Sequence, residues 1–254
     1  MQPGILRKAF FPAMFLTALL VGGCGTAPLQ EGPEVEARFP VSEIVKEDVT
    51  YPVDVYDPWE GFNRTMYNFN ARFDEYIFLP VVDGYRFITP TIVQAGVTNF
   101  FNNLGDLKTL LNTIVQLKPM PSLETASRLV WNTTAGLLGV IDVASAMDIT
   151  RHEEDFGQTL GHYGVGDGPY LVLPILGPSN LRDTTGLVVD TLAFREIDPL
   201  DLDDHSDREI LYFLLNAIDT RANIGFRYYQ TGSPFEYDMV RMLYTTKRKL
   251  DIAK

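Results

Sequence analysis

The first strong hydrophobic pattern begins after Asp57 and has the period of an α-helix. Its large apolar side chains recur at alternating steps of three and four residues: Trp59, Phe62, Met66, Phe69 and Phe73. That spacing places them on one continuous face, which we expect to be buried. Asp57 stands before Pro58, and Glu60 occupies the glutamate position of a capping box. The pattern therefore predicts a helix with Asp57 as its N-cap.

Helical spacing continues in the next stretch of the chain. A helix is predicted to open at Thr89-Pro90 and to end at Gly105, and Asp106 is predicted to cap another that stops before Pro119. The positions expected to point inward in these two helices are Val93, Val97, Phe100, Leu104, Leu107, Leu110, Leu111, Ile114 and Leu117.

The C-terminal half carries further helix starts, predicted at Ser122, Ser179, Ser206 or Asp207, and the capping box Ser233-Pro-x-Glu236. The helix after Ser122 is expected to run towards Met147. Inward positions in the other three are Leu187 and Val188, then Ile210, Leu214, Ala217 and Ile218, then Met239, Val240 and Leu243. Because we find no sustained two-residue alternation, no Asn-Gly hairpin signal and no internal repeat, we predict an all-α fold with a single, mostly helical domain over residues 56–254.

Two apolar stretches differ from ordinary amphipathic helices. Residues 135–149 are apolar nearly all round, and 170–176 form a second apolar run interrupted by Pro174. Both are shorter than the ~20 residues that a membrane-spanning helix needs. They are interpreted either as a buried helix and a buried loop or as elements that dip into a bilayer. In the second case the membrane-contact candidates are Leu137, Leu138, Val140 and Ile141.

The N-terminus has the organisation of a bacterial lipoprotein signal peptide. Arg7 and Lys8 precede an uncharged apolar stretch from Ala9 to Val21, and small residues lead to Cys24, the single cysteine of the chain. This pattern predicts cleavage after residue 23 and a lipid anchor on Cys24, with Gly25 favouring the outer membrane. The alternative is an ordinary secreted protein with one unpaired cysteine, which is a liability in an oxidising compartment.

Charge narrows the classes of partner. The 254 residues carry a formal net charge of -12, which argues against nucleic acid and against electrostatic adhesion to anionic lipid. Residues 24–55 combine scattered prolines with many acids and little periodicity, so we predict an acidic flexible tether between the anchor and the helical domain.

The sequence holds little that indicates catalysis. The run Gly164-x-Gly166-x-Gly168 lacks the lysine and the strand–helix context of a phosphate loop, and there is no Gly-x-Ser-x-Gly elbow. Three histidines without organised carboxylates do not make a metal site. We therefore predict no enzyme activity, no metal and no cofactor.

Several motifs together resemble the MlaA (VacJ) family of lipoproteins. They are Asp57-Pro-Trp-Glu-Gly-Phe-Asn-Arg-Thr-Met-Tyr-Asn-Phe-Asn70, Asp155-Phe-Gly-Gln-Thr-Leu-Gly-His-Tyr-Gly-Val-Gly-Asp-Gly-Pro-Tyr-Leu-Val-Leu-Pro174, Leu176-Gly-Pro-Ser179 and Arg182-Asp183. Shorter matches are Val97-Thr-Asn-Phe-Phe101, Asn132-Thr-Thr134 and Val240-Arg241-x-x-Tyr244. The resemblance extends over about residues 56–247.

The resemblance implies a Gram-negative outer-membrane lipoprotein on the periplasmic side, ring-like, with an amphipathic channel and a glycine-rich hairpin. Such proteins partner with trimeric porins, remove phospholipids misplaced in the outer leaflet and pass them to a soluble periplasmic carrier. The residues expected to shape the lipid path are Gly164, Gly166, Gly168, Pro169, Tyr170, Leu173 and Pro174. β-Branched residues at the three glycines are expected either to strain the backbone or to narrow the lipid path. The alternatives are an envelope-scaffolding lipoprotein and a lipid hydrolase.

Overall fold

The computed structural model describes residues 55–202, 206–230 and 232–254. Contacts divide the chain into two units, Met1–Val49 and Thr50–Lys254, and every described residue belongs to the second. The predicted signal peptide, Cys24 and the predicted tether up to residue 54 lie outside the described residues.

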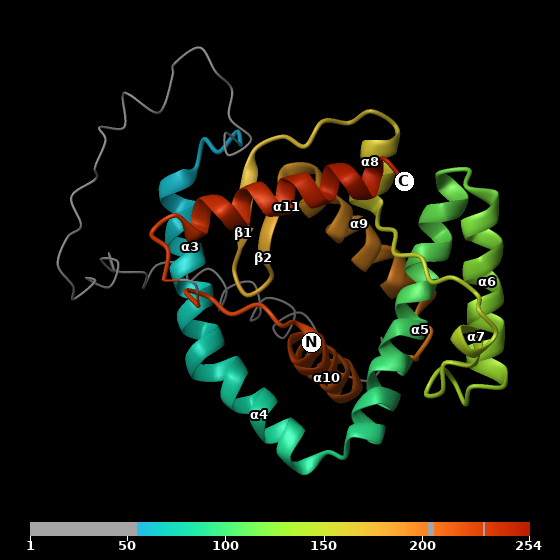
Figure 1. The fold of residues 1–254 in the computed structure, drawn as a ribbon. Coiled ribbons are helices and arrows are strands. Elements are labelled where there is room, and N and C mark those ends of the chain that lie inside the picture. The colour runs from blue at the N-terminus through green and yellow to red at the C-terminus, as the bar shows by residue number, and fades with distance from the viewer. Residues whose placement is uncertain (1–54, 203–205, 231) are drawn as a thin grey trace, which may run out of the picture. The chain divides into compact units, whose positions relative to one another are not determined.

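The described part is mostly helical, as the sequence predicts, with one small two-stranded sheet (Figure 1). The elements are α3 (Glu60–Phe73), the π-helix η1 (Asp74–Phe78), α4 (Leu79–Ile88), α5 (Thr91–Val115), α6 (Pro119–Thr134), α7 (Val143–Ala146), α8 (Phe156–His162), β1 (Tyr170–Leu173), β2 (Gly177–Asn180), α9 (Leu181–Ile197), α10 (Ser206–Asn223) and α11 (Glu236–Ile252).

The first helical stretch is longer than a single helix, because α3, η1 and α4 follow one another without a break. The π-turns between them start at Asp74, which is buried at 4% exposure. Its carboxylate accepts a hydrogen bond of 2.7 Å from Arg221 of α10. Insertions of this kind are frequent where a helix is adapted to a specific partner, and here the partner is an ion pair that ties α3–η1–α4 to α10.

Asp57 does not cap α3. The N-cap position is Trp59, without a side-chain cap, and the helix begins at Glu60. The Asp57 carboxylate instead accepts hydrogen bonds from Asn63 at 2.7 Å, from Arg241 at 3.0 Å and from the Tyr237 hydroxyl. The prediction of Asp57 as N-cap was wrong, because Tyr237 and Arg241 on α11 bind its carboxylate in place of the backbone amides of α3.

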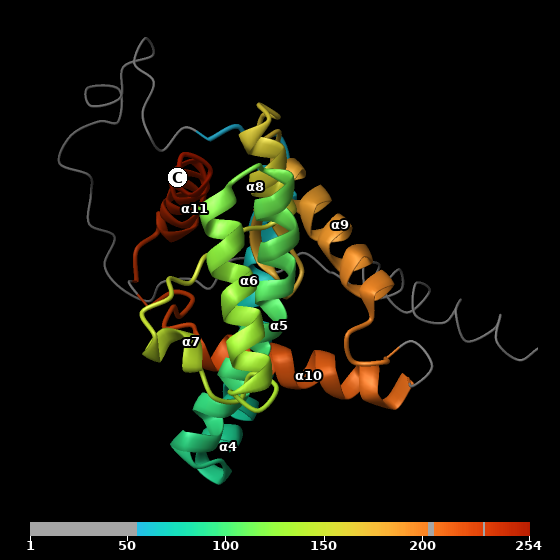
Figure 2. The same ribbon diagram turned by 90° about the vertical axis from the view of Figure 1, so that its right-hand side faces the viewer.

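The first and last described helices lie against each other. The Tyr67 hydroxyl on α3 donates to Glu236 on α11 at 2.7 Å, and Arg64 lies 3.2 Å from Asp238. Elsewhere α5 and α6 pack side by side (Figure 2), α10 contacts both α4 and α5, and α8 contacts both α9 and α11. Side-chain contacts thus join α11, the last described helix, to α3, the first.

Helix α5 runs through the predicted break at Gly105 and Asp106. Asp106 is buried at 1% exposure, and its carboxylate lies 3.5 Å from Arg128 of α6. It therefore serves contact between helices and caps none. The division into two helices was wrong because a tertiary ion pair uses the aspartate that looks like a local cap.

Other boundaries move by a few residues. Helix α6 starts at Pro119, three residues before Ser122, and ends at Thr134, well before the predicted Met147. Asn180 caps α9 in place of Ser179, since its side chain accepts a hydrogen bond from the Asp183 amide. The predicted start of α10 at Ser206 is confirmed, whereas α11 begins at Glu236 with Phe235 at its N-cap position, two residues later than a capping box with Ser233 as N-cap predicts.

The interior of the described part is unusually polar. Its buried side chains include many asparagines, threonines, aspartates and arginines, whereas the principal buried apolar cluster is Tyr67, Tyr170, Val172 and Tyr237. Positions that the sequence predicts to be inward but that are exposed are Trp59, Phe62, Phe69, Val93, Leu111, Ile114, Leu117, Leu187, Val188, Ile210, Leu214, Met239 and Leu243. The prediction of helices from their period is thus correct, but the prediction of which face is buried is wrong for these positions. Hydrogen bonds between helices bury the polar face instead.

A membrane-spanning helix needs about 20 predominantly apolar residues in succession. None of the helices within residues 55–202, 206–230 and 232–254 is both long enough and apolar enough to cross a bilayer.

Candidate functional site

A β-hairpin presents apolar side chains at its tip. Strands β1 and β2 pair antiparallel, with Tyr170 opposite Asn180 and Leu173 opposite Gly177. The turn is formed by residues 174–176, of which Ile175 has a φ of +68° and is 44% exposed, while Leu176 is 67% exposed. The sequence shows no alternation that would predict paired strands. This short hairpin is therefore a departure from the predicted all-α fold. Its tip therefore exposes the apolar side chains of Ile175 and Leu176 on the surface.

Asparagine side chains on α3 pair with the free edge of β1. Asn63 donates to the Tyr170 carbonyl at 3.0 Å and accepts from the Val172 amide at 2.8 Å. Asn70, two helical turns further on, does the same with the Leu173 carbonyl at 2.9 Å and the Ile175 amide at 2.7 Å. Each amide thereby replaces one residue of a missing third strand. Because unpaired buried backbone groups are costly, these two side chains fix the hairpin on α3.

The glycine-rich segment lies before the hairpin and is not its turn. Gly164 ends α8 at a φ of +87°, and its amide donates to the Gly161 carbonyl at 2.9 Å. Gly168 has a φ of +68°, and a Cβ there would lie 3.2 Å from Leu181. Gly166 has no positive φ, and a Cβ there would meet nothing within 4 Å. Of the two expected costs, backbone strain therefore applies at Gly164 and Gly168 but not at Gly166, where clearance in the lipid path stays a prediction.

These glycines give a matched pair for mutation. Gly168→Val is expected to lower the free energy of unfolding by about 1–3 kcal/mol, because a β-branched residue is strained at positive φ and crowds Leu181. Gly166→Val places the same side chain in open space two residues away and is expected to change stability by about 0.5 kcal/mol or less. Urea unfolding of both variants measures the difference. Equal losses would contradict this account of the segment.

Helix α8 is pressed closely against α9 beside this segment. A Cβ on Gly157 would lie 2.6 Å from the Asp183 carboxylate, and one on Gly186 would lie 2.3 Å from the Gly157 backbone nitrogen. Only glycine allows this approach, since real Cβ contacts are not that short. The close packing brings Asp155, which caps α8 by accepting from the Gln158 amide at 2.9 Å, near Asp183 of α9.

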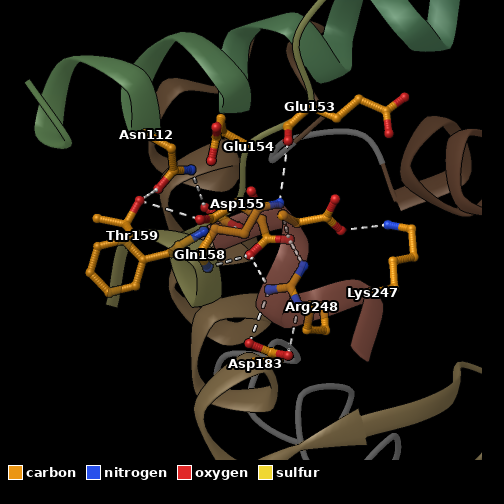
Figure 3. A network of polar contacts seen from close by, with 12 residues as sticks. Asn112, Glu153, Glu154, Asp155, Gln158, Thr159, Asp183, Lys247 and Arg248 are labelled. Atoms are coloured by element: carbon orange, nitrogen blue, oxygen red, sulfur yellow. Dashed lines mark hydrogen bonds and ion pairs between the residues drawn. The ribbon is translucent and has the colours of Figure 1, made fainter. Parts of the chain in front are cut away.

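Arg248 of α11 joins these two helices (Figure 3). Its guanidinium group donates to Asp155 at 2.7 and 2.8 Å and to Asp183 at 2.8 and 3.0 Å. The Tyr244 hydroxyl donates to Asp183 at 2.7 Å. A planar guanidinium suits such bidentate binding better than an ammonium group does. Three helices therefore converge on one arginine at the base of the hairpin.

The charges of this network control its ionisation. Burial raises the pKa of Asp155, but hydrogen bonds and charge from Arg248 outweigh burial and bring that pKa to about 2. Burial likewise raises the pKa of Asp183, and bonds from Arg248 and Tyr244 lower it below the usual range. Both carboxylates are thus ionised at neutral pH and matched to the arginine. Such a network of ion pairs holds the three helices together.

Residues 135–149 form mainly turns, so the prediction of a continuous apolar helix is wrong. Leu137 and Leu138 both have positive φ, 53° and 59°, and the short α7 begins only at Val143. Arg128, which is 1% exposed, holds the segment by donating to Asp142 at 2.9 and 3.0 Å and to the Ile149 carbonyl at 2.8 Å. The backbone is bound firmly enough to keep two leucines in a conformation they rarely adopt.

The side chains of this segment point outward. Exposed fractions are 67% for Leu137, 66% for Leu138, 44% for Val140 and 50% for Ile141. The alternative of a buried helix is therefore wrong, and the hydrophobic residues form an exposed apolar turn. Apolar surface concentrated in this way marks a contact with membrane or protein.

Comparison with known proteins identifies the family at this point. A family model described as "MlaA lipoprotein" matches residues 55–251, which is nearly the whole described part. The chain belongs to the MlaA lipoprotein family. The motifs that carry this resemblance in the sequence include Asp57, Asn63, Asn70, Asp155 and Asp183, all of which bind partners in the interior.

Individual relatives match shorter stretches of the chain. An uncharacterized protein of Rickettsia prowazekii is 39% identical over 169 residues, 66% of each chain. The "Intermembrane phospholipid transport system lipoprotein MlaA" of Escherichia coli K12 is 44% identical over 138 residues, 53% of this chain and 55% of the relative. The matches thus span somewhat less than two thirds of the length of these curated relatives.

A solved structure also matches. It is described as "Structural basis for maintenance of bacterial outer membrane lipid asymmetry", is 33% identical and has a TM-score of 0.64. The match covers 78% of this chain and 100% of that one. The fold described above is therefore an MlaA fold.

Sequence reasoning missed the residues that hold the site together. Asn63, Tyr67 and Asn70 recur at steps of four and three, so they define a helical face as regular as the apolar one beside it. A polar face with that regularity could have indicated buried hydrogen bonding. Arg248 carries no such signal, since an arginine near a helix C-terminus usually lies in solvent. Among the described residues, no group of three or more metal-binding side chains is placed to hold an ion.

Proposed function

We propose that this protein is a lipid-anchored outer-membrane lipoprotein that removes misplaced phospholipids from the outer leaflet and passes them to a soluble periplasmic carrier. The observation that carries the proposal is the hairpin, whose apolar tip is held by Asn63 and Asn70 beside a polar interior. A path for phospholipid needs apolar surface for tails and polar surface for the headgroup. The names of the E. coli relative and of the matching structure support the same activity.

Exposed apolar side chains support a position in the membrane. Phe87 and Ile88 at the end of α4 are 91% and 76% exposed, and Ile92 at the start of α5 is 81% exposed. Leu192 of α9 and Leu211 of α10 are exposed as well. A soluble monomer seldom shows so much apolar surface, whereas helices packed through polar faces with apolar faces outward suit a bilayer. We include in the proposal a ring-like arrangement around an amphipathic channel, on the periplasmic side of the membrane.

The lipid path is assigned to the outer face of the hairpin. Leu173 and Pro174 are partly buried and adjoin the exposed tip, so their remaining apolar surface is suited to contact acyl chains. Tyr170 is 1% exposed and packs against Tyr237 and Tyr244, so its side chain supports the strand from behind. Gly164, Gly166, Gly168 and Pro169 form the approach to the strand. No residue is assigned a catalytic role, and trimeric porins and the soluble carrier are the partners within this proposal.

Complementation of a deletion strain tests the proposal. Leu176→Asp adds a charge at the hairpin tip, where the side chain is 67% exposed, and is expected to leave abundance normal but fail to restore outer-membrane lipid asymmetry. The matched control is Leu250→Asp, because Leu250 is 63% exposed on α11 away from the hairpin. Surface phospholipid, measured by outer-leaflet labelling, distinguishes the outcomes. Full activity of Leu176→Asp at normal abundance favours the scaffolding alternative, and lysophospholipid released by the purified protein would favour a hydrolase.

The lipid anchor is tested separately. Cys24→Ala is expected to abolish lipidation and to block normal signal cleavage, because the modified thiol is what the lipoprotein peptidase acts on. Mass spectrometry of the N-terminus measures both effects, and the unmodified protein should begin with a triacylated Cys24. A mature protein that starts elsewhere or carries a free thiol would contradict the anchor.

A further inference from the structure

A charged cavity lies away from the hairpin tip. Its volume is about 830 Å³, and it is bounded by α5, the start of α6, residues 151–155, α8 and the last turns of α11. This size falls in the range of about 300–1,000 Å³ that is usual for small-molecule sites. Its lining is rich in charged residues, which sets it apart from the apolar surfaces assigned to lipid tails.

The lining carries more positive than negative charge. Six lysines and arginines face four carboxylates, in a chain whose formal net charge is -12. Two carboxylates just behind the lining have arginines of their own. Asp106 lies 3.5 Å from Arg128, and Asp183 lies 2.9 Å from Arg182. The cavity is thus a cationic site on an acidic protein.

Two of the six basic side chains form ion pairs within the wall of the cavity. Lys118 lies 3.0 Å from Glu154, with only 17% of its side chain exposed, and Arg248 is held by two aspartates as described above. These two neutralise carboxylates of the wall and are unavailable to a ligand. Four positive groups remain.

The remaining four are incompletely neutralised. Lys247 and Lys254 share the single carboxylate of Asp251, at 2.6 and 2.8 Å, and both side chains are more than 70% exposed. Arg151 approaches its nearest carboxylates only at 3.7 and 3.8 Å. Lys108 of α5 also lines the cavity; its charge acts to lower the pKa of Asp155 and of Asp190, but within the described part of the chain its ammonium group forms no ion pair.

We propose that this cavity binds a phosphate-bearing anion between Lys108 on one side and Lys254 with Lys247 on the other. A phosphate group accepts several charge-assisted hydrogen bonds at once, so it can engage ammonium groups from two sides of the cavity together with the guanidinium of Arg151, which lines it as well. The phosphate can belong to a lipid headgroup or to a soluble phosphorylated molecule. This site is separate from the hairpin, and its binding does not depend on the proposed transport activity.

The test uses the full lipidated protein in detergent, with sn-glycerol 3-phosphate as the soluble probe. Calorimetric titration measures binding, and amine labelling followed by mass spectrometry reports on each lysine. The probe is expected to protect Lys108 and Lys254 from labelling and to leave Lys249 reactive, since Lys249 shares α11 but does not line the cavity. The paired change Lys108→Gln and Lys254→Gln should weaken binding about tenfold or more, and Lys249→Gln should have no effect.

A second arm distinguishes the two sources of phosphate. The same labelling is repeated in nanodiscs of phosphatidylcholine with and without phosphatidylglycerol. Protection by phosphatidylglycerol, without binding of the soluble probe, identifies a lipid headgroup, whereas protection by the soluble probe alone identifies a soluble ligand. If neither protects Lys108 and Lys254 more than Lys249, or if the paired variant binds as well as the unmodified protein, the proposal is wrong. Lipid asymmetry in cells is measured independently, so failure of this site leaves the transport proposal standing.

Discussion

Replacing Arg248 with methionine is expected to lower the free energy of unfolding by about 3–5 kcal/mol, the usual cost of leaving a buried charge without its partner. Methionine fills similar space but leaves Asp155 and Asp183 close together without the guanidinium that both bind. Helices α8, α9 and α11 lose their shared contact at the base of the hairpin. Urea unfolding followed by circular dichroism measures the loss.

Lys249→Met is the matched control, because it removes a charge from the next, exposed position of α11. It is expected to change stability by about 0.5 kcal/mol or less. In the double variant Arg248→Met with Asp155→Asn, one of the stranded carboxylates is removed as well, so the combined loss should be smaller than the sum of the single losses. Strict additivity would mean that the network contributes nothing beyond packing.

Acid provides an independent check on the same network. The pKa of Asp155 is about 2 in the folded protein and about 3.9 in an unfolded chain. A depressed folded-state pKa gives stability that is fully present above the unfolded value and is lost as pH falls towards the folded value. The deficit of Arg248→Met should therefore be largest at neutral pH, narrow as the pH falls through the acid range and be small near pH 2. A deficit independent of pH would exclude the ion pairs as its cause.

The sequence predicts the helical nature of the domain but not the direction in which its helices face. On α3, the period of Trp59, Phe62 and Phe69 is correct, yet these side chains are 47%, 46% and 44% exposed. Period is a local property, whereas the buried face depends on what surrounds the helix. The assumption of an apolar interior and an aqueous exterior fails where buried asparagines and aspartates connect the helices.

The hairpin is a second feature that the sequence alone does not predict. Strand β1 is only four residues long, and the groups that pair with its free edge belong to Asn63 and Asn70, more than 100 positions earlier in the chain. Neither alternation nor turn residues encode such a pairing. The family resemblance implies a glycine-rich hairpin, whereas the glycines lie between the end of α8 and the start of β1, outside the turn of the hairpin.

The exposed turn after α6 gives the other large expected effect. Changing both Leu137 and Leu138 to aspartate is expected to lower membrane partitioning of a protein made with a cleavable signal and no lipid anchor by about two orders of magnitude or more. Each leucine contributes about 1.5–3 kcal/mol when its side chain leaves water, and every 1.4 kcal/mol is a factor of ten. Both side chains are about two-thirds exposed in the protein itself, so the membrane is where that surface would be buried.

The backbone conformation at these two positions favours aspartate, so the substitution should not destabilise the fold. Leu137 and Leu138 have φ of 53° and 59°, a region that aspartate adopts more readily than leucine. The variant should therefore fold at least as stably as the parent while its affinity for lipid falls. Flotation with liposomes measures partitioning, and urea unfolding checks the fold. Leu250→Asp, on an exposed position of α11, controls for added charge and should float like the parent. If the double variant also floats like the parent, the turn does not enter the membrane, and its strained backbone, fixed by Arg128 and Asp142, would have to serve a protein contact instead.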